Sequence, residues 1–196
     1  MKDKPSEIID GLECTHITEK DMPAIIAFQG MREDGRSMEL YLVKFAIEDE
    51  KEGLARTYLV KDRETGEIVC FFSLKAGMIS INDTGRKLFG KNESFGTVPG
   101  MELSHLAMNG AYVREHQQAK GLFVDIFDSF IIPIVKAAQE MIGLRYLYVF
   151  AINRESLIEY YKMLGFRRLK PEDEEKLNIR IRPHYNKDCI FMFMKI

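Results

Sequence analysis

The chain has 196 residues, enough for one well-buried core, so we expect a single domain over residues 1–196. No apolar run approaches the roughly 20 residues that cross a bilayer, and no apolar signal follows Met1. The sequence therefore predicts a cytoplasmic protein without a membrane partner. Its 28 Lys and Arg and 30 Asp and Glu give a formal net charge of −2, and this balance counts against a nucleic-acid partner.

The N-terminal part predicts one strand followed by two helices. Residues 11–18 alternate weakly between apolar and polar side chains, as a strand does. Thr18 and Asp21 are spaced as in a capping box, so we expect a helix from Thr18 to about residue 29. A polar turn at 29–37 then leads into a second helix over 37–55, where apolar residues recur at helical spacing.

A hairpin is expected next. Two β-rich runs, 57–60 and 68–74, flank a short polar turn with one glycine, and the second strand is expected to continue to about residue 81. Cys70 lies inside that strand, which favours a buried, inert thiol over a nucleophile. Residues 82–100 are rich in Asn, Gly, Lys and Ser and predict a long surface loop.

The second half of the chain has the stronger pattern. Residues 102–108 predict a strand. Apolar pairs that recur every four residues predict a long helix from Gly121 to Gly143. Pro133 removes one backbone donor inside this helix, so we expect a kink near Ser129.

The remaining elements complete an α/β protein. The apolar run 146–152 predicts a strand buried on both faces, and Asn153 is expected to cap a helix over 154–164. Further strands are expected from Phe166 and over 189–196. This order predicts a central mixed β-sheet of about six to seven strands with helices on both faces.

No residue pattern points to a metal or a disulfide. The three cysteines are scattered and odd in number, and the histidines have no partners at metal-ligand spacing. His105 is expected to face the side of its strand opposite to Ser104, which favours a core histidine over a catalyst. The run 170–187 carries charges of both signs and predicts a solvated loop.

One segment, residues 118–123, has the composition of an anion site. It follows a strand and lies at the mouth of a helix, where free N–H groups and the helix dipole favour negative charge. Gly121 would let a phosphate approach the main chain closely, and Lys120 can add charge. A plain loop with a glycine before a helix explains the same residues.

The context of this segment resembles a known family. Gln118 and Gly121 match Gln/Arg-x-x-Gly-x-Gly/Ala, which is the pyrophosphate-binding signature of the GNAT superfamily of N-acetyltransferases. Asn153 and Tyr161, with Gly-Phe four residues after the tyrosine, resemble the family's Asn…Tyr-x-x-x-Gly-Phe ending. The resemblance covers roughly residues 55–170, and the three motifs occur in the family's order.

The resemblance implies acetyl-CoA as cosubstrate. Its pantetheine arm would bond to the backbone of Leu106 and Met108, where the central strand parts from its neighbour, and its diphosphate would lie at the helix mouth. Helix capping alone also explains Asn153. The cofactor-binding residues implied are Leu106, Met108, Gln118, Ala119, Lys120, Gly121, Leu122, Phe123 and Asn153.

The resemblance also implies direct attack of a primary amine on the thioester, without an acyl-enzyme. Glu102, at the start of the central strand, would deprotonate the amine through water, although a strand-end carboxylate in solvent explains it equally. Tyr161 matches the family's tyrosine and would protonate the leaving thiolate; its alternative is an aromatic anchor. Tyr160 points about 100° away and is the internal control.

Two departures leave other functions open. Phe123 stands where the family has a small residue, and the connection 109–117 is longer than usual. They motivate a non-catalytic acyl-CoA-binding sensor or interaction module as an alternative, and a toxin-like aminoacyl-tRNA acetyltransferase is a third. The expected acceptor is a small-molecule or peptide amine that enters over the turn at 29–37 and the loop at 82–100. The last strand also offers a surface for a homodimer.

Overall fold

A computed structural model describes residues 9–31, 35–80, 97–116, 119, 121–171, 173–175, 177 and 188–196. The chain divides into two compact units: unit 1 comprises Met1–Lys75 and Leu103–Pro133, and unit 2 comprises Ala76–Glu102 and Ile134–Ile196. It passes from one unit to the other inside two strands and inside the long helix. Each unit therefore contains parts of the same elements, and the expectation of a single domain stays a prediction.

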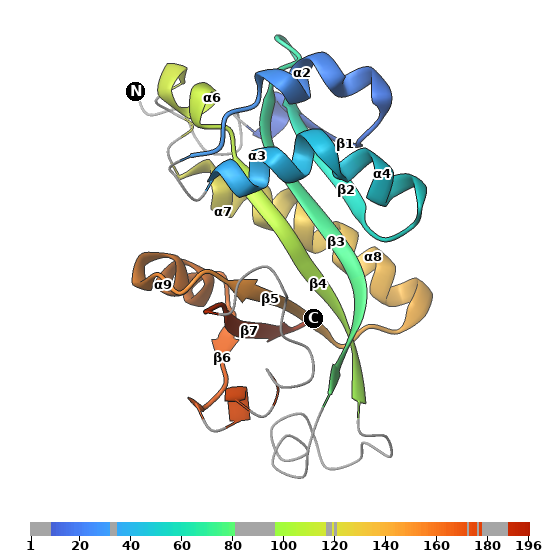
Figure 1. Cartoon of the computed structure of the whole chain (residues 1–196), viewed down its shortest axis with the longest axis vertical. Coiled ribbons are helices and arrows are strands. Elements are labelled where there is room, and N and C mark those ends of the chain that lie inside the picture. The colour runs from blue at the N-terminus through green and yellow to red at the C-terminus, as the bar shows by residue number, and fades with distance from the viewer. Residues whose placement is uncertain are drawn as a thin grey trace. The chain divides into compact units, whose positions relative to one another are not determined.

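The described residues form a mixed sheet, as predicted (Figure 1). The strand order is β1-β2-β3-β4-β5-β7-β6. β4 and β5 are parallel, with Gly100 to Glu102 opposite Tyr146 to Tyr148, whereas β1/β2, β2/β3, β5/β7 and β6/β7 are antiparallel. The strands are β1 (Leu12–His16), β2 (Arg56–Asp62), β3 (Ile68–Ser80), β4 (Thr97–Met108), β5 (Tyr146–Ala151), β6 (Arg167–Arg168) and β7 (Ile190–Lys195).

Helices flank the sheet (Figure 1). They are η1 (Glu19–Asp21), α2 (Met22–Ala27), α3 (Gly35–Lys44), α4 (Ala46–Lys51), α6 (Gly110–Glu115), α7 (Leu122–Ile126), η3 (Phe127–Ile131), α8 (Ile132–Ile142) and α9 (Glu155–Met163). The capping box at Thr18 is confirmed, because Asp21 Oδ2 accepts hydrogen bonds from the N–H and the hydroxyl of Thr18 at 2.7 and 2.8 Å.

The single helix expected over 37–55 is wrong. The structure has α3 and α4 with a break at Phe45, whose φ of −122° is not helical. Leu42 of α3 and Ala46 of α4 both reach the core at 0% exposure; residues four apart would also share a face in an unbroken helix, so the break does not cause their burial. An apolar repeat cannot locate such a bend, because Phe45 is itself apolar and yet exposed.

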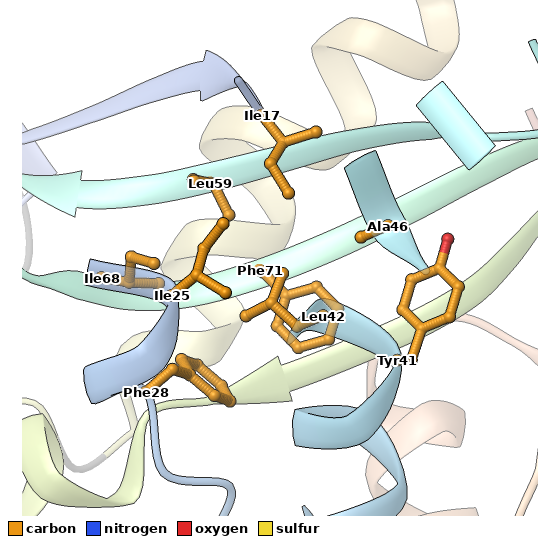
Figure 2. Packing of buried hydrophobic residues seen from close by; sticks show 9 residues of the cluster. All are labelled: Ile17, Ile25, Phe28, Tyr41, Leu42, Ala46, Leu59, Ile68 and Phe71. Atoms are coloured by element: carbon orange, nitrogen blue, oxygen red, sulfur yellow. The ribbon is translucent and has the colours of Figure 1, made fainter. Parts of the chain in front are cut away.

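The core of unit 1 fills the space between α2, α3, α4 and one face of β2 and β3 (Figure 2). Leu59 and Phe71 point to this face, and alternation sends Val60, Cys70 and Phe72 to the other. Cys70 is fully buried and burial raises the pKa of its thiol, as the sequence predicted for an inert cysteine. The core residues are Ile17, Ile25, Phe28, Tyr41, Leu42, Ala46, Leu59, Ile68 and Phe71.

The core of unit 2 is built on aromatic rings. Tyr146 and Tyr148 occupy alternate positions of β5 and contact Phe191 and Phe193 of β7. β5 is buried on nearly all of its residues, as predicted. The Tyr148 ring lies against glycines of β3 and β4: a Cβ added at Gly77 would be 2.0 Å from its hydroxyl oxygen.

The sequence did not predict α6, which occupies the long connection after β4. Asn109 caps it by accepting the N–H of Ala111 at 3.0 Å. Tyr112 donates a 2.7 Å hydrogen bond to Asp62, and Arg114 donates one of the same length to Gln29. Six residues are too few for a periodic apolar pattern, and these long-range contacts stabilise the helix.

Three boundaries in unit 2 differ from the predictions. β4 begins at Thr97, so the last residues of the expected loop 82–100 are strand; residues 81–96 lie outside the described residues. Arg154, not Asn153, is the N-cap of α9, and no side chain caps this helix. The solvated loop predicted over 170–187 is wrong where the structure describes it, because Asp173 and Glu174 are buried.

The long helix begins after Gly121 and ends before Gly143, as predicted. It contains a π-helical turn over Phe127–Ile131, in the region where a kink was expected. Pro133 has no N–H to donate to the carbonyl of Ser129, and a local change of hydrogen-bond pattern is one way in which a helix accommodates this loss.

Candidate functional site

The segment at the mouth of α7 has the backbone that an anion site requires. Gly121 has a φ of +93°, a conformation that favours glycine, and no atom of the described residues lies within 4 Å of an added Cβ. Ala119 is buried and donates its N–H to the His116 carbonyl at 2.9 Å. Gln118 and Lys120 lie outside the described residues.

The side chains after Gly121 divide between core and surface. Leu122 and Ile126 are buried, whereas Phe123 is half-buried. Leu122 therefore occupies the core position. The core covers the Phe123 ring only in part.

Leu106 and Met108 lie on the second half of β4, in unit 1, and both are half-buried. The parallel ladder between β4 and β5 pairs Gly100 to Glu102 and ends there, although β4 continues for six more residues to Met108. The backbone of Leu106 and Met108 therefore lies outside the span of that ladder.

Glu102 is half-buried and lies opposite Tyr148 in the ladder, in unit 2. Burial, and then the charge of Glu102, raise the pKa of Tyr148. The carboxylate of Glu102 is thus close enough to act on a buried phenol through its charge.

Tyr161 and Tyr160 on α9, also in unit 2, have different environments. Tyr161 is 6% exposed and packs edge-to-face on Phe166, with ring centroids 5.3 Å apart. Tyr160 is half-buried. Burial raises the pKa of Tyr161, so its phenol keeps its proton well above neutral pH. Asn153, by contrast, is exposed before the start of α9.

No protein-family model matches the sequence, and no curated protein matches it. Solved structures do match. One is a bacterial toxin, at 14% identity and a TM-score of 0.67 over 94% of this chain and 90% of that chain. Another is AtaT in complex with acetyl-methionyl-tRNAfMet, at 17% identity and a TM-score of 0.64 over 92% and 93%. A third is AtaTR bound with acetyl-CoA, at 18% identity and 0.60 over 95% and 94%. AtaT is an acetyltransferase of the GNAT type.

The chain has the GNAT fold. Other matching structures with this fold are tyrosine-to-phenylalanine mutants of AtaT and of KacT. In the part of the chain that the structure describes, no group of three or more His, Cys, Asp or Glu side chains could hold a metal. Within the same residues, no helix is both long and apolar enough to span a membrane.

The GNAT motifs did not indicate a polar cluster on the helix-covered face of unit 1. Tyr41 of α3 stacks on His105 of β4, with ring centroids 3.4 Å apart and planes 8° apart. Tyr41 also donates a hydrogen bond to Asp49 at 3.1 Å, and Asp49 lies 3.9 Å from Lys75. The expected position of His105 is confirmed, since Ala107, two residues on, also packs on this core.

The electrostatic environment of His105 predicts a loss of stability in acid. Burial, and then the charge of Lys75, lower the pKa of His105 from 6.5 to about 3. Between these two values the unfolded chain binds a proton that the folded protein does not. The free energy of unfolding should therefore fall as the pH drops from about 6.5 towards 3, and should not depend on His105 above that window.

Chemical unfolding of wild type and His105→Gln at pH 7 and pH 4.5 measures this effect. The wild type should lose more stability than the variant over that interval. Tyr41, Asp49 and Lys75, the ionisable groups packed around the imidazole, are present in both proteins, so the difference isolates His105. Equal losses would mean that the imidazole titrates normally in the folded state.

Proposed function

We propose that the protein is an N-acetyltransferase that moves an acetyl group from acetyl-CoA to a primary amine. The observation that carries the proposal is the left-handed glycine, Gly121, which opens a helix directly after the connection from β4. In the GNAT fold this junction lies after the central strand. The backbone N–H groups at the start of α7 would bind the diphosphate of the cosubstrate, helped by the helix dipole.

The other residues of the site have complementary roles. The backbone of Leu106 and Met108 would bond to the pantetheine arm, which is compatible with a β4–β5 ladder that ends at Glu102. The phosphate site would also include Gln118, Ala119, Lys120, Leu122 and Phe123. Asn153 is exposed and does not cap α9. Its side-chain amide would therefore be available to the cofactor.

The reaction needs no covalent enzyme intermediate. The amine nitrogen forms a bond to the thioester carbonyl carbon, and the carbon–sulfur bond breaks. The amine loses one proton through water to Glu102, and Tyr161 gives its phenolic proton to the thiolate, regaining one from solvent. The raised pKa of Tyr161 supports this role, because a general acid must hold its proton at neutral pH.

The α-amine of an aminoacyl-tRNA is the acceptor to test first. AtaT, which shares the fold, is found in complex with acetyl-methionyl-tRNAfMet. In unit 2 three exposed cations follow α9, namely Arg167, Arg168 and Lys170; Arg168 is paired with Glu174 at 3.0 Å. They would suit a phosphate backbone despite the net charge of −2. Small amines and peptide amines are the other acceptors to be tested in the same assay.

Calorimetric titration with acetyl-CoA, using two matched glycine variants, tests the cofactor site. Gly121 and Gly66 both have positive φ, +93° and +75°, and an added Cβ at either meets nothing within 4 Å. Alanine at either position therefore strains the backbone similarly. We expect Gly121→Ala to weaken binding at least tenfold and Gly66→Ala, in the β2–β3 turn, to leave it unchanged. Equal affinities, or no binding by the wild type, would contradict the proposed site.

Transfer is then measured as release of free thiol with methionyl-tRNA, small amines or a peptide N-terminus as acceptor. For methionyl-tRNA the rate should fall steeply with added salt, because counterions compete for the tRNA phosphates. Binding of acetyl-CoA without turnover on any of these acceptors would favour the non-catalytic sensor instead.

A further inference from the structure

The hydrogen bonds around His105 fix which of its ring nitrogens carries the proton. The hydroxyl of Ser104 donates to the carbonyl oxygen of Ser73 at 3.2 Å, and a carbonyl can only accept. The hydroxyl has one hydrogen, and with this hydrogen directed at the carbonyl, Ser104 Oγ accepts from Nδ1 of His105, also at 3.2 Å. Nδ1 therefore carries the hydrogen of the neutral imidazole, and Nε2 presents its lone pair.

The ring is also held in place. It stacks on Tyr41, whose own hydroxyl is fixed by its hydrogen bond to Asp49. Figure 2 shows Tyr41 at one end of the apolar core of unit 1, away from Ile68 and Phe28. His105 is half-buried there, and Nε2 makes no hydrogen bond to the described part of the chain. A fixed imidazole thus presents one hydrogen-bond acceptor, Nε2, at the end of this core where Tyr41 lies.

The position of His105 suits the acceptor side of the proposed reaction. It directly precedes Leu106, which we assign to the pantetheine arm, and it faces α3 rather than the opposite side of the sheet. The acceptor is expected to enter over residues 29–37, of which 35–37 begin α3 and 32–34 lie outside the described residues. All of the groups named here belong to unit 1.

We propose that Nε2 of His105 accepts a hydrogen bond from the attacking amine of the acceptor and orients its lone pair towards the thioester. This inference rests on the proposed acetyltransferase function and adds a substrate contact to it. His105 takes no proton: the proton that the amine loses on attack passes to water. An orienting contact of this kind raises the rate by holding the reacting atoms in an attack geometry.

The surrounding charge supports this role. Lys75 disfavours positive charge at the imidazole, and it would act in the same direction on an amine bound at Nε2.

Three variants separate the hydrogen bond from the packing of the ring. His105→Gln places an amide near the position of Nε2, His105→Asn reaches only the position of Nδ1, and His105→Phe keeps the stacked ring without nitrogen. With methionyl-tRNA as acceptor, we expect kcat/KM to fall about tenfold to hundredfold for Asn and Phe, the loss of one hydrogen bond in the transition state. The Gln variant should stay within about fivefold of wild type. The KM for acetyl-CoA should not change in any of them.

Full activity of His105→Phe, or a Gln variant as poor as Asn, would overturn the proposal. Nitrogen NMR of isotope-labelled histidine gives a readout that needs neither activity nor a variant that folds well. In the wild type, Nδ1 should be the protonated nitrogen, and the Nε2 signal should move when methioninamide is added. A protonated Nε2, or an Nε2 signal that stays fixed, would exclude the contact. Absence of acetyl-CoA binding would instead count against the proposed function itself.

Discussion

Replacing Tyr161 by phenylalanine is expected to lower kcat for acetyl transfer by about 100-fold or more, the usual contribution of a positioned general acid. The variant lacks only the phenolic hydroxyl. Its ring can keep the edge-to-face contact with Phe166, so stability should change little. Initial rates of thiol release, measured with saturating acetyl-CoA and methionyl-tRNA, report kcat directly.

Tyr160→Phe is the matched control, because Tyr160 is the next residue of the same helix and points elsewhere. It should retain wild-type kcat. The loss in Tyr161→Phe should persist from pH 6 to pH 9, since the raised pKa of Tyr161 keeps the phenol protonated across that range. Equal rates for the two variants would leave Tyr161 as an aromatic anchor and remove it from the proposed chemistry.

Replacing Gly77 by alanine is expected to produce a large loss of stability. The new methyl group would lie 2.0 Å from the hydroxyl oxygen of Tyr148 and 3.1 Å from Cζ of the same ring. Tyr148 is buried against Phe191 and Phe150, so its ring has little room to move. Overpacking of this kind costs about 1–3 kcal/mol, which corresponds to a melting temperature lower by roughly 2–12 °C.

A double-mutant cycle identifies the clash. Tyr148→Phe removes the hydroxyl oxygen, so Gly77→Ala should cost much less in that background than in the wild type. Gly100→Ala is the control, because its added Cβ would lie 3.1 Å from the carbonyl oxygen of Tyr146 and from a ring carbon of Tyr148. Tyr148→Phe relieves neither contact. Additive effects of Gly77→Ala and Tyr148→Phe in thermal unfolding would show that the hydroxyl is not the obstacle.

The candidate site was only partly predictable. Gly121 was found because a positive φ before a helix requires a residue type that is visible in the sequence. The spacing to Gly165 favours Tyr161 over Tyr160; Tyr161 is the more buried of the two, and its role in catalysis stays a prediction. The surroundings of His105 were missed, because Tyr41, Ser73 and His105 come from three separate segments and no local pattern joins them.

The sequence by itself determined the kinds of elements and their order. Alternation produced the strands, a four-residue apolar repeat produced the long helix, and glycines marked its ends at 121 and 143. These signals are local, because they depend on which faces of one segment are apolar. They were sufficient to predict the mixed sheet and its helices.

Only the tertiary structure decided where segments bend and which polar groups meet. The break at Phe45 appears only in the folded backbone, and α6 is held by contacts to Asp62 and Gln29 that lie far away in the sequence. The choice of Arg154 over Asn153 as N-cap is likewise not encoded in the residue type alone. Such features depend on the free energy of packing between distant segments, which a pattern within one segment cannot report.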